Sequence, residues 1–119
     1  MTERGSVSVE LGLLIPVVLV LLAIVAETAA IAQAQVALVH ASREGARAAA
    51  VAPDVADAVD AVERSLPVRL AERASVSVER SRGVGLPVRV TVRASHELFR
   101  FVGGVPVVLG WTTTMRSER

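Results

Sequence analysis

The feature that most constrains this chain is an uncharged apolar run from Leu11 to Ala26, in which Val, Leu and Ile dominate. As a helix this run would measure about 24 Å, which is shorter than the roughly 30 Å hydrocarbon core of a bilayer. Extending the helix to Ala32 reaches the required length and brings Glu27 into the span. We therefore predict that residues 6–32 form the transmembrane part of a long helix.

The helical pattern continues without a break from this span to Pro53, and no small-x-small cleavage site ends the apolar run. We predict that residues 33–52 are a soluble continuation of the same helix. Small residues recur at spacings of three or four along one of its faces, where they permit close approach of another backbone. This small-residue stripe consists of Ala30, Ala34, Ala37, Ala41, Gly45, Ala48 and Ala52.

The stripe has two interpretations. Alanine is the strongest helix former, so the stripe could simply reflect helix propensity. Gly45 favours packing, because a glycine inside a helix costs roughly 1 kcal/mol relative to alanine.

Residues 53–119 are predicted to form an α+β head, with one short helix and a three-stranded antiparallel sheet. Asp54 is a suitable N-cap, and the apolar residues that follow it have helical spacing. Three stretches then alternate with period two, which predicts strands over residues 74–79, 87–94 and 105–115. In the middle strand we expect an inward face made of Val88, Val90, Val92 and Ala94.

The connections between these strands differ in character. Gly83 and Gly85 make a short turn, which predicts an antiparallel hairpin between the first two strands. Residues 95–104 separate the second and third strands and contain both phenylalanines, Phe99 and Phe101. This segment could be a flap over the core or an exposed contact patch, and we favour the flap slightly.

No pattern in the sequence indicates a catalytic site. The chain has no cysteine, which excludes disulfides and thiolate metal sites. His40 and His96 lack companions at metal-ligand spacing, and we expect His40 to pair with Glu44 on the helix surface. No serine lies in a nucleophile elbow and no glycine-rich loop is suited to phosphate. We expect a protein that is not an enzyme, with no catalytic residue, metal or cofactor.

A nucleic-acid partner is also not expected. The formal net charge is +1 and aromatic residues make up only 3% of the chain. Stacking on aromatic side chains is a main source of affinity for single strands. A basic sheet face is nevertheless conceivable, formed by Arg80, Arg82, Arg89 and Arg93.

The N-terminal residues carry a family resemblance. "RGSVSVE", residues 4–10, resembles the processing site of type IV prepilin-like proteins, in which a peptidase cuts after a glycine and the fifth mature residue is glutamate. The corresponding cut lies between Gly5 and Ser6, and Glu10 becomes that fifth residue. A leader this short, residues 1–5, is similar to those of the Tad (tight adherence, Flp-type) subgroup.

The rest of the helix narrows the resemblance to TadE-like pseudopilins. These share an apolar helix with a proline, a glutamate near its end and an Arg-Glu-Gly-Ala-Arg block. The matching residues here are Pro16, Glu27 and the block Arg43, Glu44, Gly45, Ala46 and Arg47. The closing "TTTMR" also resembles the family's last strand, whereas Leu11 departs from the aromatic residue that commonly follows the glutamate.

The resemblance implies a minor pilin or pseudopilin that is cut by a prepilin peptidase and assembled with other pilin subunits and the Tad assembly machinery. It would be a single-pass protein of the cell membrane with its head outside the cytoplasm, and it could reach a surface pilus. Glu10 would pair with the Ser6 amine of a neighbouring subunit. The physics supports this pairing, because a carboxylate in lipid is costly until it has a partner.

Other interpretations remain open at this point. Taken alone, Glu10 also fits an acid in a first helical turn, which the helix dipole favours. Glu27 marks the outer membrane boundary or pairs within a helix bundle. The chain could instead be a membrane-anchored extracytoplasmic binding module that enters no fibre, or a minor pilin that binds nucleic acid through its arginine-rich strands.

Overall fold

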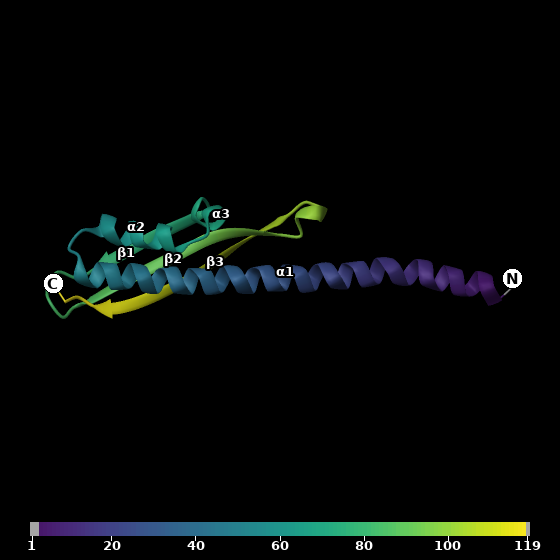
Figure 1. Ribbon diagram of the computed structural model, residues 1–119, viewed down its shortest axis with the longest axis horizontal. Coiled ribbons are helices and arrows are strands. Elements are labelled where there is room, and N and C mark those ends of the chain that lie inside the picture. The colour runs from purple at the N-terminus through teal and green to yellow at the C-terminus, as the bar shows by residue number, and fades with distance from the viewer. Residues whose placement is uncertain (1–2, 119) are drawn as a thin grey trace. The chain divides into compact units, whose positions relative to one another are not determined.

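The computed structural model describes residues 3–118 of the chain. They form two compact units that are divided between Ala30 and Ile31. The helices are α1 (Glu3–Val51), α2 (Val55–Ser65), α3 (Val68–Ala71) and the 3-10 helix η1 (Arg100–Val102), and the strands are β1 (Ala74–Arg80), β2 (Pro87–Leu98) and β3 (Val105–Arg116) (Figure 1). The predicted α+β class, with a long N-terminal helix, a short second helix and a three-stranded antiparallel sheet, is confirmed.

The first unit consists of the N-terminal part of α1. Its large apolar side chains are exposed, with Val18 at 43% and Leu13 at 68% marking the extremes between residues 11 and 25. The most apolar window of α1 has a mean hydropathy of 2.8 and none of it is buried within the chain. By length and composition, this helix could cross a membrane.

The second unit, from Ile31 onward, contains the sheet. The strand order is β1-β2-β3, and both neighbouring pairs are antiparallel. The predicted inward face of β2 is confirmed, since Val88, Val90 and Val92 are fully buried and Ala94 is 1% exposed. Alternation with period two therefore identified the correct face of the central strand.

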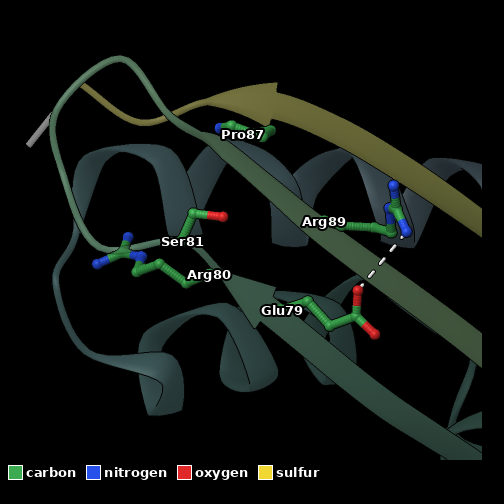
Figure 2. Close-up of a pocket in the computed structure, with 5 residues that line it drawn as sticks. All are labelled: Glu79, Arg80, Ser81, Pro87 and Arg89. Atoms are coloured by element: carbon green, nitrogen blue, oxygen red, sulfur yellow. Dashed lines mark ion pairs between the residues drawn. The ribbon is translucent and has the colours of Figure 1, made fainter.

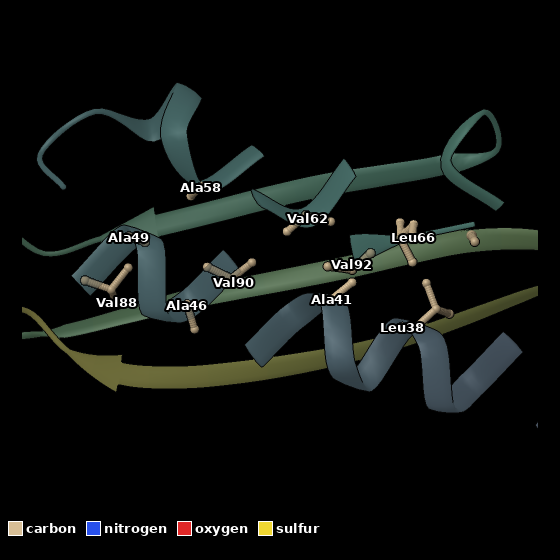
Figure 3. Close-up of a cluster of buried hydrophobic side chains, with 11 residues drawn as sticks. Leu38, Ala41, Ala46, Ala49, Ala58, Val62, Leu66, Val88, Val90 and Val92 are labelled. Carbon is tan, nitrogen blue, oxygen red and sulfur yellow. The ribbon is translucent and has the colours of Figure 1, made fainter. Parts of the chain in front are cut away.

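The core lies between this face of the sheet and two helices (Figure 3). The last turns of α1 and the apolar side of α2 supply the facing residues. Along α1 these are Leu38, Ala41, Ala46 and Ala49, and along α2 and just after it they are Ala58, Val62 and Leu66. Most of them are alanine or valine, so the helices can approach the sheet closely.

The segment between α1 and α2 follows the predicted capping chemistry. The carboxylate of Asp54 accepts a hydrogen bond from the backbone N–H of Ala56 at 3.0 Å. This bond satisfies one of the free donors at the start of α2. The helix that follows buries Ala58 and Val62.

Two elements differ from the prediction. The second strand was expected to end at Ala94, but β2 continues to Leu98 because β3 pairs with it as far as Leu98 and Val105. The single turn α3 was not predicted. It begins after Pro67, whose φ of −56° already has a helical value.

Candidate functional site

The first candidate site is the start of α1, where the processing and assembly residues were predicted. Ser6 and Glu10 are both exposed, and Gly5 is half-buried. A spacing of four residues places Ser6 and Glu10 on the same helix face. Among the described side chains, Glu10 has no hydrogen bond or ion pair with another residue of the chain. Its carboxylate therefore stands on the exposed apolar surface.

The other two predicted motif residues of the apolar half also lie on α1. Pro16 lies inside the helix and is surrounded by exposed apolar side chains. Glu27 is half-buried and makes a polar contact. It is the only carboxylate between Glu10 and Glu44, so it interrupts the apolar surface of the helix once.

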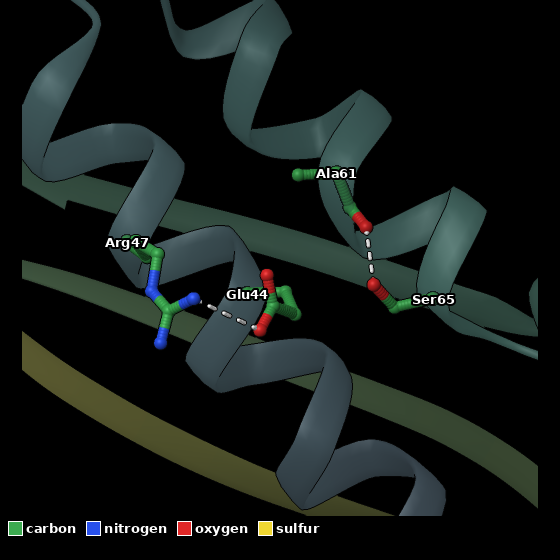
Figure 4. Close-up of polar contacts among 4 residues, drawn as sticks. All are labelled: Glu44, Arg47, Ala61 and Ser65. Atoms are coloured by element: carbon green, nitrogen blue, oxygen red, sulfur yellow. Dashed lines mark hydrogen bonds and ion pairs between the residues drawn. The ribbon is translucent and has the colours of Figure 1, made fainter.

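The Arg-Glu-Gly-Ala-Arg block has an exposed side and a buried side. Arg43 and Arg47 are exposed, whereas Gly45 and Ala46 are buried. Glu44 forms an ion pair with Arg47, with 3.7 Å between Oε1 and Nη1, and not the predicted pair with His40 (Figure 4). The block thus combines two exposed arginines, of which Arg47 is paired with Glu44, with two residues that are small enough to pack.

Gly45 packs against both α2 and the sheet. A Cβ added at this position would clash with Cγ2 of Val62 and would lie 3.1 Å from Cγ1 of Val90. Val62 and Val90 are fully buried and β-branched, so neither side chain can move aside easily. Glycine is required here because α1, α2 and β2 come close together at this point.

The rest of the small-residue stripe changes character along the helix. Ala41 is buried, Ala34, Ala37 and Ala48 are half-buried, and Ala30 is exposed. From Ala41 onward the stripe faces other parts of its own chain. Its N-terminal end remains accessible.

Two polar residues on α1 were not identified from the sequence. The Gln35 side chain donates a hydrogen bond from Nε2 to the Gly110 carbonyl at 3.0 Å, and the Ser42 hydroxyl lies 2.7 Å from the Thr113 hydroxyl. Both therefore contact β3. Their spacing of seven residues, on the face that carries Leu38, was the available signal.

The predicted basic sheet face is wrong for Arg80. This residue is aligned with Val88 and lies on the inner side of the sheet. Its guanidinium donates hydrogen bonds to the carbonyls of Ala49 and Ala52, the latter at 2.7 Å, and so closes the end of α1. The negative end of the helix dipole also stabilises a cation at this point.

The outer face of the sheet keeps two arginines, Arg89 and Arg93. Arg89 forms an ion pair with Glu79, with 3.6 Å between Nη1 and Oε2, beside an open polar hollow next to Pro87 (Figure 2). Because a carboxylate neutralises one of the two arginines, this face has little excess positive charge. It gives little support to a nucleic-acid partner.

Side chains that could perform catalysis do not gather in the part of the chain that the structure describes. Over residues 3–118 there is no group of three or more His, Asp or Glu side chains that could hold a metal ion. The hollows over the outer sheet face are open and are lined by Ser, Thr, Arg and Glu side chains. The residues that stand out are those of the α1 surface.

Comparison with known families addresses this surface directly. Residues 5–47 match the family model described as TadE-like protein. This part of α1 is similar to TadE-like proteins. The matched segment begins at Gly5 and ends at Arg47, so it includes both the apolar half of α1 and the Arg-Glu-Gly-Ala-Arg block. The comparisons with curated proteins and with solved structures gave no match.

The TadE-like match points to a protein associated with Tad pili. Together with the long apolar helix, it also points to membrane anchoring. The match stops before α2 and the sheet. The matched segment therefore covers α1 from Gly5 to Arg47, and it includes the first residues of α1 that pack into the core of the head.

Proposed function

We propose that this chain is a minor pilin or pseudopilin-like structural subunit of a Tad-type pilus or secretion assembly. The observation that carries the proposal is the surface of α1: a TadE-like helix whose most apolar window is wholly unburied within its own chain. Such a surface must be covered by lipid or by neighbouring helices. In a subunit that moves from the membrane into an assembly, lipid covers this surface first and neighbouring helices cover it afterwards.

In this proposal a prepilin peptidase cuts the chain after Gly5, and Ser6 becomes the new N-terminus. The Glu10 carboxylate then pairs with the Ser6 amine of a neighbouring subunit. A single charge in hydrocarbon costs several kcal/mol, and the attraction between opposite charges is strong there. Pairing is therefore favourable only in a register that brings these two groups together.

The head would be held outside the cytoplasm by a single membrane span that ends near Glu27. The accessible end of the small-residue stripe, Ala30 and Ala34, would face neighbouring helices in the assembly. Close backbone approach at such residues is a common basis of helix association in membranes.

The proposal is tested by mass spectrometry of the N-terminus in membrane fractions and in fibres sheared from cells. We expect a mature chain that begins at Ser6. The variant Glu10→Gln keeps the shape of the side chain and removes its charge, so we expect normal membrane insertion and a strong loss of assembly. Ser8→Ala, on the same exposed helical turns, is the matched control and should assemble normally.

Assembly of Glu10→Gln at the wild-type level would show that the charge pair is not used. An uncut chain that stays in the membrane and never enters a fibre would instead support the anchored extracytoplasmic binding module. These two outcomes are distinct, because the first concerns the pairing and the second concerns the assembly itself.

A further inference from the structure

The far end of the β2–β3 hairpin carries exposed apolar side chains with no cover from the rest of the head. β1 pairs with β2 only as far as Ala94, so the hairpin continues alone beyond that point (Figure 1). We define residues 99–105 as the hairpin tip. Within it, Phe101 is 65% exposed, Val102 is 75% exposed and Val105 is 56% exposed. The flap that the sequence favoured is therefore an exposed patch.

The direction of the hairpin follows from three contacts that α1 makes with β3 and with the residues directly after it. Gly110 is bonded to Gln35, Thr113 contacts Ser42, and the N–H of Glu118 donates to the Ala50 carbonyl at 2.9 Å. Residue numbers rise together along both elements, so the two run side by side in the same direction. The first two contacts lie about 10 Å apart along the helix and about 10 Å apart along the strand.

This parallel course determines where the tip lies within the second unit. Val105 is about 17 Å beyond Gly110 along the strand. Ile31, where the unit begins, is only about 6 Å beyond Gln35 along the helix. The hairpin therefore extends past the N-terminal end of the helical part of this unit. That end is the one from which the chain continues into the apolar segment.

We propose that the hairpin tip inserts into the membrane–water interface. This inference rests on the membrane anchoring in the proposed function. The tip lies at the end of the second unit where Ile31 begins, and all of its exposed side chains except Arg100 are apolar. A second contact of this kind would fix the orientation of the head on the membrane before assembly.

The low charge of the tip and its single basic residue favour lipid as the partner. Between Leu98 and Leu109 the only charged residue is Arg100, which is exposed and pairs with Glu97 at 3.5 Å. A long basic side chain beside apolar residues can keep its charge at the headgroups while the rest enters the acyl boundary. Phe99, which contacts Phe101 edge to face, has a φ of 52°. A left-handed backbone is strained for an aromatic residue, so the tip has a defined shape.

The test uses the absence of cysteine from the chain, which makes single-cysteine labelling specific. The full-length variants Val102→Cys, Val84→Cys and Val18→Cys are labelled with a fluorophore and reconstituted into vesicles that contain anionic lipids. Val84 is the matched control, because it is also a valine at 75% exposure and lies in the turn at the opposite end of β2. Nitroxide lipids labelled near the headgroup or deep in the acyl chain serve as quenchers.

We expect the label at residue 102 to be quenched several-fold more by the shallow lipid than the label at residue 84. Equal, weak quenching at 102 and 84, with residue 18 quenched by the deep lipid, would overturn the tip proposal and leave the anchoring intact. Weak quenching at residue 18 would instead contradict the proposed anchoring. Shielding of residue 102 that appears only at high protein density would show that its partner is a neighbouring subunit and would also overturn the proposal.

Discussion

The hydroxyls of Ser42 on α1 and Thr113 on β3 lie 2.7 Å apart inside the head. Ser42 is fully buried, and its hydroxyl also donates to the Val39 carbonyl at 2.8 Å. Since a serine hydroxyl has one proton, Thr113 must be the donor in the pair. This bond connects the TadE-like helix to the last strand of a sheet that lies outside the matched segment.

Removing this bond should destabilise the head. For Ser42→Ala we expect a loss of about 1–2 kcal/mol in the free energy of unfolding, because the Thr113 hydroxyl loses its acceptor. Denaturation of the full chain in detergent, followed by the fluorescence of its single tryptophan, Trp111, measures the change. The double variant with Thr113→Val should lose less than the sum of the single variants.

The hydroxyl pair of Thr91 and Thr112 is a matched control for this cycle. Its oxygens lie 2.9 Å apart on the exposed side of the same sheet. We expect coupling within about 0.5 kcal/mol there, since water replaces the lost partner. Additive effects at Ser42 and Thr113 would show that their bond adds nothing to stability.

The close packing at Gly45 gives a second prediction. We expect Gly45→Ala to lower the free energy of unfolding by about 1–3 kcal/mol, because the new methyl group overlaps Val62 and this overpacking outweighs the gain in helix propensity. We expect the Tm to fall by at least about 4 °C as well. Gly12→Ala is the control on the same helix, since no atom lies within 4 Å of a Cβ built there. If both variants unfold alike, the close approach at Gly45 is not limiting.

The closure of α1 by Arg80 gives a third prediction. Arg80→Met keeps much of the apolar stem and removes the donors to the carbonyls of Ala49 and Ala52. We expect a loss of about 1–3 kcal/mol, measured by the same denaturation. Arg80→Lys should recover only part of it, because both carbonyls accept from Nη2 and the lysine nitrogen is one bond nearer to its own backbone. Arg89→Met, which breaks an exposed ion pair, should change stability by less than about 1 kcal/mol.

The two exposed arginines of the family block give a fourth prediction, which depends on the proposed function. Arg47 has 72% of its side chain exposed, so its charge is available to a neighbour. We expect Arg43→Glu combined with Arg47→Glu to reduce fibre yield strongly while the Tm changes by only a few degrees. Arg69→Glu combined with Arg82→Glu, at two exposed positions outside α1, makes the same change in net charge and is the control. Unchanged fibre yield would leave only the buried half of the block with a role.

The structure could be predicted from the sequence where a local pattern of residues decides it. Alternation identified the inward face of β2, and Asp54 identified the start of α2, because burial and capping act on the residues themselves. The family resemblance was carried by residues on α1, and residues 5–47 match the TadE-like family. The processing of Gly5 and the pairing of Glu10 stay predictions, since both depend on a second molecule.

Prediction failed where a residue's role depends on a distant part of the chain. The extension of β2 to Leu98 arises from pairing with β3, which outweighs the polar character of Ser95 and His96. Arg80 has the composition of a surface residue, but its register places it beside the end of α1. The partners of Gly45, Gln35 and Ser42 are likewise set by tertiary packing, and no local pattern names them.

The contacts of β3 also have a consequence for biosynthesis. β3 pairs with the whole length of β2 and makes two side-chain contacts with α1, yet it is made after every other element described. While β3 is still within the ribosome, the sheet lacks the strand that pairs along β2 and that contacts Gln35 and Ser42 of α1. In the proposed function, the apolar start of α1 is therefore delivered to the membrane before the head is complete. The order of elements along the chain would then let the head cross the membrane before it folds.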